Sequence, residues 1–378
     1  MKLALLVLAA GAASVSAIEA PAERSSERLA LLTRGETALA ARDPAQALAA
    51  LEQAARISHS ADTEMAIVRS FMQAGEYRRA LAFGAHTAGA HPGEAGGAAL
   101  YAWLLHIGAQ GLVAQRLLAQ SLERSPGEPL LGQVAIQLRK PWPRAAGVLM
   151  RPPSRLAPYG DAKGLPAGAT VIASATLVAA GTAALVPASA LVKGARYWVR
   201  SGLGRLAEAR PDPAPSTHGL SLLRLAAALP GPALLAARGT AFPGSIAFAV
   251  EFAPQPDATP AWPLMKAGFV GPASSDGATR ALGVELPNGS GRGGPVFDAA
   301  GHLIGVAAST GIAGADMLVP PPLLRQAFGD SLFDAAAPAA ARPSAPDAIY
   351  EPALSQSLQL IRSGPARRAM ATPRFQLQ

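Results

Sequence analysis

The residues that could carry chemistry are few, and the most conspicuous lie in one glycine-rich segment of the second half of the chain. The segment Gly289-Ser-Gly-Arg-Gly-Gly-Pro-Val-Phe-Asp298 contains one hydroxyl, Ser290, and one guanidinium, Arg292. Acyl transfer needs a nucleophile, an imidazole base and a carboxylate that orients the base. Arg292 can neither attack a carbonyl carbon nor release its proton near neutral pH. The chain has no Cys, which excludes a thiol nucleophile and a Cys-ligated metal.

Histidine is the other residue type suited to both catalysis and metal binding, and the chain has six. His86 and His91 lie close in sequence, but the residues around them offer no third ligand. Structural zinc sites use four ligands, so we expect no metal site here. We expect no cofactor either.

The composition limits the class of protein. Hydrophobic residues make up 50% of the 378 residues and charged residues 15%, which excludes a disordered polyelectrolyte. The net charge of +8 arises from residues 139–215, which hold 11 Lys or Arg and three acidic residues. This basic band could make peripheral contact with an anionic membrane or an acidic partner, and a solvated linker is the alternative. No nucleic-acid-binding motif accompanies it, so nucleic acid is not an expected partner.

Residues 1–17 have the pattern of a cleavable signal peptide. Lys2 supplies a positive start, residues 3–13 are uncharged and apolar, and Val15-Ser16-Ala17 offers small residues before a cleavage site. The apolar stretch is too short to span a bilayer comfortably. We therefore expect cleavage after Ala17 and a mature protein that is periplasmic or secreted.

A second uncharged stretch, residues 164–192, raises the question of a transmembrane helix. It contains Gly168, Gly181, Pro187 and many small residues, which insert poorly into a bilayer. We expect a buried β-hairpin broken at Ala179-Ala180-Gly181 instead.

Residues 24–138 have the periodicity of helices, with Ala and Leu at three- and four-residue spacing. The segments 41–48 and 74–81 resemble each other at an offset of 33, and Pro126 follows Pro92 by 34. This period resembles the tetratricopeptide family, in which each unit is a helix–turn–helix. The resemblance implies about three stacked units with a concave surface that binds peptides or proteins. A helical bundle that only supports the second half is the alternative.

The residues that carry this resemblance are small or turn-forming. The second unit has Gly75, Tyr77, Ala80 and Pro92 at the family's positions; the first keeps Gly35, Ala47, Leu51 and Ala54; the third keeps Ala114 and Pro126 but has Ala109 in place of the turn glycine. A small Ala80 allows two helices to approach closely. The family pattern implies that Phe71 and Tyr77 pack between the helices of their unit.

The rest of the chain divides into three parts. Residues 139–165 are rich in Pro and Arg, as is typical of an interdomain linker. From 166 to 330 the period changes to two, with short strands and Gly/Pro turns, which predicts an all-β domain. Residues 331–378 begin as an Ala/Pro-rich tail and place apolar residues at helical spacing over 348–361, which predicts one short helix.

The segment 289–306 resembles the nucleophile loop and following hairpin of trypsin-like serine proteases. That family has Ser directly before Gly-Gly-Pro, where this chain has Arg292. Residues 178–191 and 219–225 resemble the segments that carry the catalytic His and Asp, and here Ser189 and Gly219 stand at those positions. The resemblance implies a multidomain α plus all-β protein: helical repeats followed by a trypsin-like double β-barrel without its catalytic triad. We expect a non-catalytic scaffold that binds other proteins in a bacterial envelope or extracellular assembly.

Two alternative functions to the scaffold stay open. Ser290 lies two residues before Arg292 and His218 directly before Gly219, so a displaced Ser–His pair would give an active serine endopeptidase. A periplasmic chaperone or carrier would instead hold exported polypeptides in the repeat groove. Arg292 with the amides of Gly293 and Gly294 would suit a carboxylate or a chain terminus, unless Arg292 folds over and plugs the site.

Overall fold

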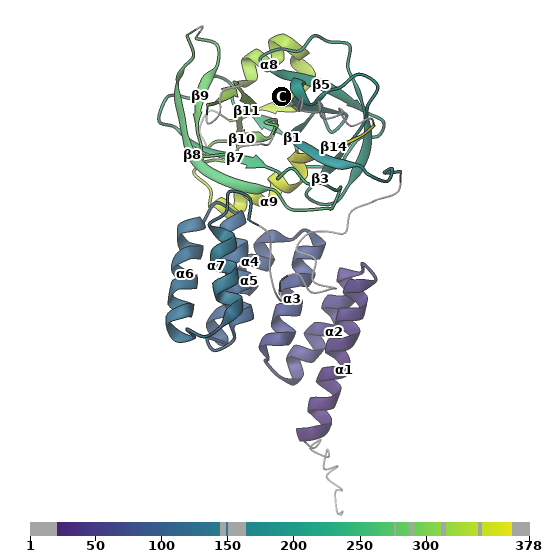
Figure 1. Ribbon diagram of the computed structural model, residues 1–378, viewed down its shortest axis with the longest axis vertical. Helices are drawn as coiled ribbons and strands as arrows, with labels where there is room; N and C mark the ends of the chain where they lie inside the picture. Colours follow the sequence, from purple (N-terminus) through teal and green to yellow (C-terminus); the bar gives the residue numbers. More distant parts are fainter. Residues whose placement is uncertain are drawn as a thin grey trace, which may run out of the picture.

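The computed structural model describes residues 21–143, 149, 164–275, 277–286, 291–310, 315–338 and 342–364. They form an elongated molecule with α-helices at one end and β-strands at the other (Figure 1). The predicted signal peptide (residues 1–17), most of the predicted linker and residues 365–378 lie outside the described residues. Across the described ranges, no helix combines the length and the apolar character needed to cross a membrane.

Seven helices precede the first strand in the described part of the chain. They are α1 (Pro21–Ala40), α2 (Pro44–Ile57), α3 (Ala61–Ala74), α4 (Tyr77–Ala90), α5 (Ala95–Ile107), α6 (Gly111–Arg124) and α7 (Pro129–Leu138). Each helix packs against the next one along the chain, and α5 also packs against α7. Short turns join them, so the chain forms three successive helix pairs followed by α7 (Figure 1).

The small residues of the period are placed where helices approach or turn. A Cβ atom on Gly35 of α1 would lie 2.6 Å from Cγ of Leu51 on α2, so glycine permits this close approach. Gly75 ends α3 in the left-handed conformation with φ +81°, which glycine adopts without strain. Ala109 takes the corresponding turn before α6 with φ +65°. Ala80 is fully buried, as expected for a small residue between packed helices.

The first β-barrel is closed, and its six strands follow the order β1-β14-β3-β4-β5-β2. Their bounds are β1 (Thr170–Val178), β2 (Ala183–Pro187), β3 (Arg196–Ser201), β4 (Leu206–Pro211), β5 (Leu220–Leu225) and β14 (Ser357–Ser363). The predicted hairpin within residues 164–192 is confirmed, because β1 and β2 pair antiparallel. Its turn contains Ala179, Ala180 and Gly181 with φ +52°, +49° and +83°.

The structure contains the short helix predicted near the C-terminus, but strand β14 corrects the predicted end of the β domain. We expected the β domain to end at residue 330 and residues 348–361 to contain a short helix. The helix α9 (Pro346–Gln356) ends before β14, which pairs with both β1 and β3. Leu358 and Leu360 pack into the barrel interior. Their alternation with polar residues is the period of a strand, and the helical spacing of neighbouring apolar residues concealed it.

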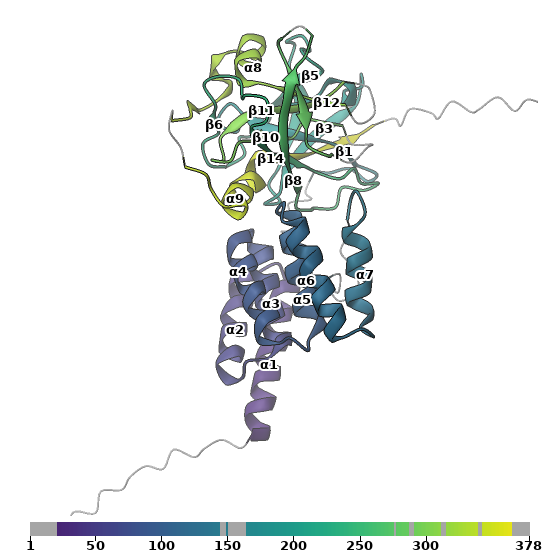
Figure 2. The same ribbon diagram turned by 90° about the vertical axis from the view of Figure 1, so that its left-hand side faces the viewer.

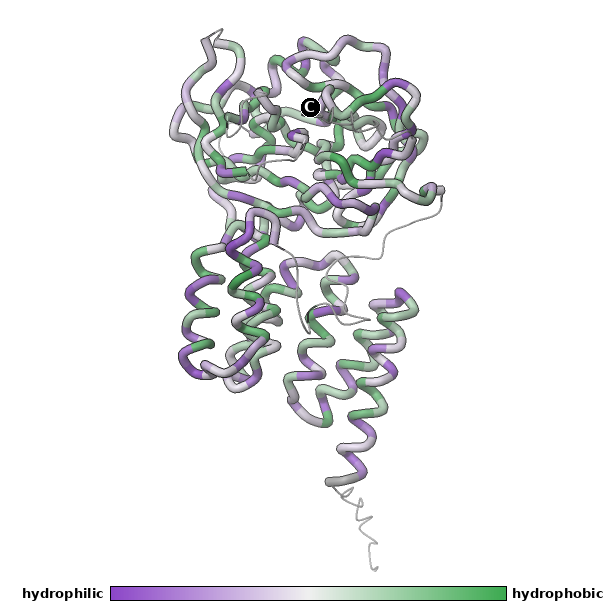
Figure 3. Tube along the Cα trace, in the orientation of Figure 1, coloured by the Kyte–Doolittle hydropathy of each residue, from purple (hydrophilic) through white to green (hydrophobic). Residues whose placement is uncertain are grey.

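The second barrel is also a closed ring, formed by β7, β8, β9, β12, β11 and β10. The strands of this part are β6 (Leu235–Ala236), β7 (Ile246–Glu251), β8 (Leu264–Ala273), β9 (Arg280–Gly283), β10 (Pro295–Phe297), β11 (Leu303–Ser309), β12 (Asp316–Val319) and β13 (Ala335–Ala336), with helix α8 (Pro321–Phe328) after β12. The pairing of β10 with β11 closes the ring, and β6 and β13 extend it from β11. Hydrophobic residues gather along the strands inside the barrels (Figure 3). The predicted fold class is confirmed in its architecture, because an α-helical part is followed by a double β-barrel.

Helix α9 lies between the barrels and the helical stack (Figure 2). The ring of Tyr77 on α4 lies 4.5 Å from that of Tyr350 on α9 and 5.8 Å from that of Trp262, measured between centroids. The Tyr77 hydroxyl also donates a hydrogen bond to the carbonyl of Leu104 at 2.8 Å. The contacts of Tyr77 therefore extend beyond its own helix pair. They join the helical part to the β part. Both parts share one continuous hydrophobic core.

Candidate functional site

The segment Gly291–Gly294 lies between the two barrels and is held by strand β1. The carbonyl of Gly291 accepts a hydrogen bond from Ser174 N at 3.2 Å, and the hydroxyl of Thr176 donates to the carbonyl of Gly293 at 2.7 Å. A Cβ atom on Gly293 would lie 2.9 Å from Cδ of Pro187, at the end of β2. Only glycine fits this gap, so the glycine-rich motif is explained by close contact with the first barrel.

The other two predicted segments adjoin each other beside Pro187. Ser189 lies in a short 3-10 turn, Ala188–Ala190, directly after β2, and is exposed. The backbone N–H of Ala188 donates to the carbonyl of Gly219 at 2.8 Å. Gly219 has φ +75° and a Cβ atom there would meet only the carbonyl of Ser309, at 3.7 Å. The three segments predicted from the protease resemblance thus meet around Pro187, and neither Ser189 nor Gly219 contributes an imidazole or a carboxylate.

Arg292 is directed into the protein rather than toward solvent. Its side chain is 4% exposed, and its Nε lies 2.9 Å from Oδ1 of Asp316 on β12. One terminal nitrogen donates to the carbonyl of Leu286 at 3.2 Å. The guanidinium is therefore bound by the chain's own groups, which supports the plug alternative over a ligand-binding role.

The amides of the loop also have an internal acceptor. The N–H of Gly294 donates to Oε1 of Glu251 at 3.2 Å, and Glu251 at the end of β7 is completely buried. Burial raises the pKa of Glu251 to about 7, although the Ser174 hydroxyl, the Arg292 charge and the amides of Gly294 and Gly293 act in the opposite direction. Of the two alternatives for Arg292, Gly293 and Gly294, a pocket for a carboxylate or chain terminus and a plugged site, the contacts with Glu251 and Asp316 favour the plugged site. Sequence reasoning missed both acids, and the lone charge at the end of the apolar run Ile246–Val250 was the available signal for Glu251.

Of the alternative Ser–His pair, the structure describes only the histidine. His218 is half-buried and has φ +51° beside Gly219. Ser290 lies outside the described residues. The pairing of Ser290 with His218 therefore stays a prediction.

A hollow of about 540 Å³ lies beside the barrels and not at the loop. Its lining includes Leu177, Gly181, Leu234, Asp334 and Gln356, and none of residues 291–294 contributes. The loop amides therefore do not face this hollow.

Two arginines of the basic band have partners within the first barrel. Arg200 on β3 is fully buried, and its Nε donates to Oε1 of Gln359 on β14 at 2.9 Å. Arg196 is exposed and lies 3.4 Å from Glu208 on the neighbouring strand. Part of this charge therefore belongs to the fold of the first barrel, which leaves less of it for an acidic partner or a membrane.

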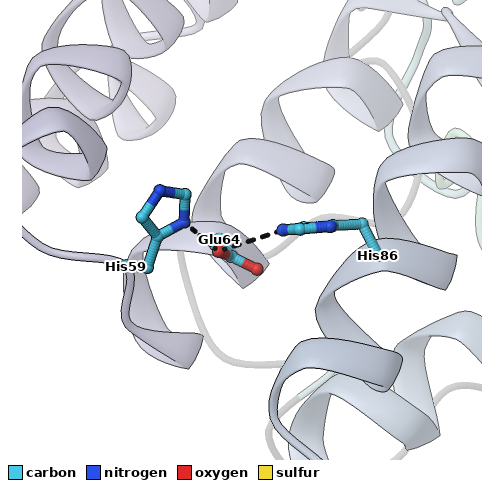
Figure 4. Close-up of side chains that lie close together, drawn as sticks. All are labelled: His59, Glu64 and His86. Carbon is cyan, nitrogen blue, oxygen red and sulfur yellow. Dashed lines mark hydrogen bonds and ion pairs between the residues drawn. The ribbon is translucent and has the colours of Figure 1, made fainter.

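A second group of chemistry-bearing side chains lies in the helical part (Figure 4). The expectation that His86 and His91 have no further ligand near them is wrong, because His59 and Glu64 lie beside them. Glu64 lies on α3, His86 lies on the helix that packs against it, and His59 lies in the turn before α3, so the distance along the chain hid their proximity.

Comparison with known proteins gives one distant structural similarity. No family model and no curated protein matches the sequence. Among solved structures, the crystal structure of the serine endoprotease from Yersinia pestis is similar at 14% identity with a TM-score of 0.32. The match covers 44% of this chain and 58% of that chain, so this chain spans less than two thirds of that structure's length. Likeness at this level carries no argument about activity.

Proposed function

We propose that the chain is a non-catalytic scaffold that binds other proteins, and that its β part is a trypsin-like protease domain without a catalytic triad. The observation that carries the proposal is that the loop before Pro295 makes its polar contacts with the protein's own side chains. Arg292 is buried against Asp316 there, and the amide of Gly294 donates to Glu251. The other two triad positions hold Ser189 and Gly219.

This arrangement opposes acyl transfer at two points. Amides that stabilise a developing oxyanion must be free and aimed at it from about 2.7–3.1 Å. Here the amide of Gly294 donates to the Glu251 carboxyl group and is not free for such a role. A nucleophile also needs an adjacent base, and the residues at the expected positions cannot remove a proton. A displaced Ser290–His218 pair would have no support from the Gly294 amide as long as Glu251 accepts its hydrogen bond.

The helical part supports a binding role. We interpret the three helix pairs as tetratricopeptide-like units, on the turn at Gly75 and the buried Ala80. At the far end of the stack, Leu112 on α6 and Ile136 on α7 are 80% and 56% exposed. A hollow of about 240 Å³ lies between these helices and has an apolar lining that includes Leu118. We interpret the exposed apolar residues and the hollow on these two helices as part of a protein-binding surface.

The site of action follows from residues 1–17, whose pattern is that of an export signal. We place the scaffold in the periplasm or outside the cell, with one or more proteins of an envelope or extracellular assembly as partners.

Labelling with a fluorophosphonate probe tests the absence of catalysis. We expect no stoichiometric labelling of the full chain under conditions that fully label an active serine endoprotease. Stoichiometric labelling that is lost in Ser290→Ala would overturn the proposal and establish the displaced pair.

Co-purification from the native source separates the scaffold from a chaperone. A scaffold captures a defined partner at fixed stoichiometry. A chaperone or carrier instead captures many unfolded chains weakly, and that result would replace the proposed function.

A further inference from the structure

Three histidines surround one buried glutamate in the helical part. Glu64 on α3 has a side chain only 1% exposed. Nδ1 of His59, in the turn before α3, lies 3.2 Å from Oε1 of Glu64, and Nε2 of His86 on α4 lies 3.5 Å from the same oxygen. The two rings approach Glu64 from opposite sides (Figure 4). Nε2 of His91, directly after α4, lies 3.4 Å from the other oxygen, Oε2.

These distances are those between neighbouring ligands of one metal ion. Zinc binds imidazole nitrogen and carboxylate oxygen at about 2.0–2.2 Å, so the ligand atoms of a tetrahedral site lie about 3.3–3.5 Å apart. The ligand atoms of His59, Glu64 and His86 all lie within 4.8 Å of one another. We propose that His59, Glu64 and His86 bind a zinc ion, with His91 as the fourth ligand.

Hydrogen bonding alone leaves the cluster incomplete. Oε2 of Glu64 and Nε2 of His91 are both buried and face each other at 3.4 Å, but their geometry is not that of a well-formed hydrogen bond. Buried polar atoms are rarely left without a partner. A zinc ion would provide that partner, because it accepts an electron pair from the imidazole and from the carboxylate together.

The donor set indicates the class of metal. Neutral imidazoles with one carboxylate suit zinc and neighbouring transition metals, whereas Mg²⁺ and Ca²⁺ prefer oxygen ligands throughout. The side chains of His59 and His86 are 78% and 51% exposed, so an ion can reach Glu64 from solvent. The buried Glu64 thus provides a ligand of fixed position, and the exposed His59 and His86 complete the coordination once the ion is bound.

The position of the cluster indicates a structural role. His59 belongs to the turn that joins α2 to α3, Glu64 lies on α3, and His86 lies on α4. A zinc ion bound by all of them would fasten the two helices of the second pair to each other and to the turn that joins this pair to the first. With protein ligands on every side, no coordination position stays free for a substrate, as in structural zinc sites. This inference does not depend on the proposed scaffold function.

The test uses the full chain, stripped of metal and carrying an affinity tag without histidine. Calorimetric titration with Zn²⁺ should show one ion per chain with a dissociation constant below about 1 μM. Mg²⁺ at the same concentrations should not bind. Thermal unfolding should shift upward with Zn²⁺ in proportion to its saturation. X-ray absorption of the zinc-loaded protein should show only nitrogen and oxygen ligands at about 2.0–2.1 Å.

The variant His59→Gln/His86→Gln removes two ligands that are exposed, so its fold should be retained. We expect its zinc affinity to fall at least about 100-fold and the thermal shift to disappear. The matched control is His302→Gln, because His302 also faces a carboxylate, Asp298, at 3.5 Å but has no second histidine beside it. The control should bind zinc as the parent chain does. Unchanged affinity in the double variant, or no saturable binding by the parent chain, would mean that the cluster is a hydrogen-bonded His–Glu group and would overturn the proposal.

Discussion

Replacement of Glu251 by Gln should remove a pH dependence of stability that this carboxyl group imposes. Glu251 is fully buried, and burial raises its pKa from 4.5 to about 7. The amide of Gln is nearly isosteric and keeps one oxygen that can accept the hydrogen bond from Gly294. The substitution therefore removes the titration while disturbing the packing little.

The sign and the size follow from proton linkage. Between pH 4.5 and 7 the folded state holds a proton on Glu251 that the unfolded state has released. The free energy of unfolding contributed by this group is therefore highest at pH 4.5 and below, decreases as the pH rises to 7, and is constant above. A shift of this size corresponds to about 3 kcal/mol, at about 1.4 kcal/mol for each pKa unit.

Urea unfolding of the parent chain and of Glu251→Gln, at steps between pH 4.5 and 8, measures this difference. We expect the variant to gain about 3 kcal/mol relative to the parent chain over that range. Glu208→Gln, at a half-buried position on β4 of the other barrel, is the control and should follow the parent chain. Parallel curves for Glu251→Gln and the parent chain would refute the reasoning. A relative gain in the opposite direction would show that Arg292 keeps Glu251 ionised.

Three further changes test other parts of the structure. Restoring a triad with Arg292→Ser, Ser189→His and Gly219→Asp together should give no efficient hydrolysis of peptide substrates, because the Glu251 carboxyl still holds the loop amides and φ +75° strains Asp at position 219. Ala80→Leu should destabilise the helical part by about 1–3 kcal/mol through overpacking, measured by thermal unfolding, and should weaken partner capture. Removal of residues 357–378 should open the first barrel and abolish its cooperative unfolding, whereas removal of 365–378 alone should have little effect.

The helices and the hairpin could be predicted because their signals are local. The three- and four-residue spacing of Ala and Leu gives the helical period directly, and Ala179-Ala180-Gly181 marks the turn between β1 and β2. Strand β14 was missed for the opposite reason. Its partners, β1 and β3, lie far away in the sequence, and seven residues of period two after a helix are a weak signal.

The candidate site could be predicted in position but not in its contacts. The Gly-Gly-Pro motif located the loop, yet the acids that hold it come from β7 and β12. Which acid reaches which amide depends on how the second barrel closes. The His–Glu cluster carried one usable signal, because residues one repeat apart become neighbours in a stack. His59 and His91 are separated by nearly one period of 33, so the repeat itself predicts their proximity.

The buried charges explain why the loop can keep its turn without performing catalysis. Arg292 lies against Asp316, and both side chains are at most 10% exposed. Removing one partner of such a pair leaves the other as an uncompensated buried charge, at a cost of about 3–5 kcal/mol. Asp316 thus needs the charge of Arg292 as its buried partner. In the same way, the buried carboxyl group of Glu251 needs the hydrogen bond from the Gly294 amide. Each group that would have to be freed for chemistry at this loop is already bound within the fold, so restored catalysis would first have to overcome a loss of stability.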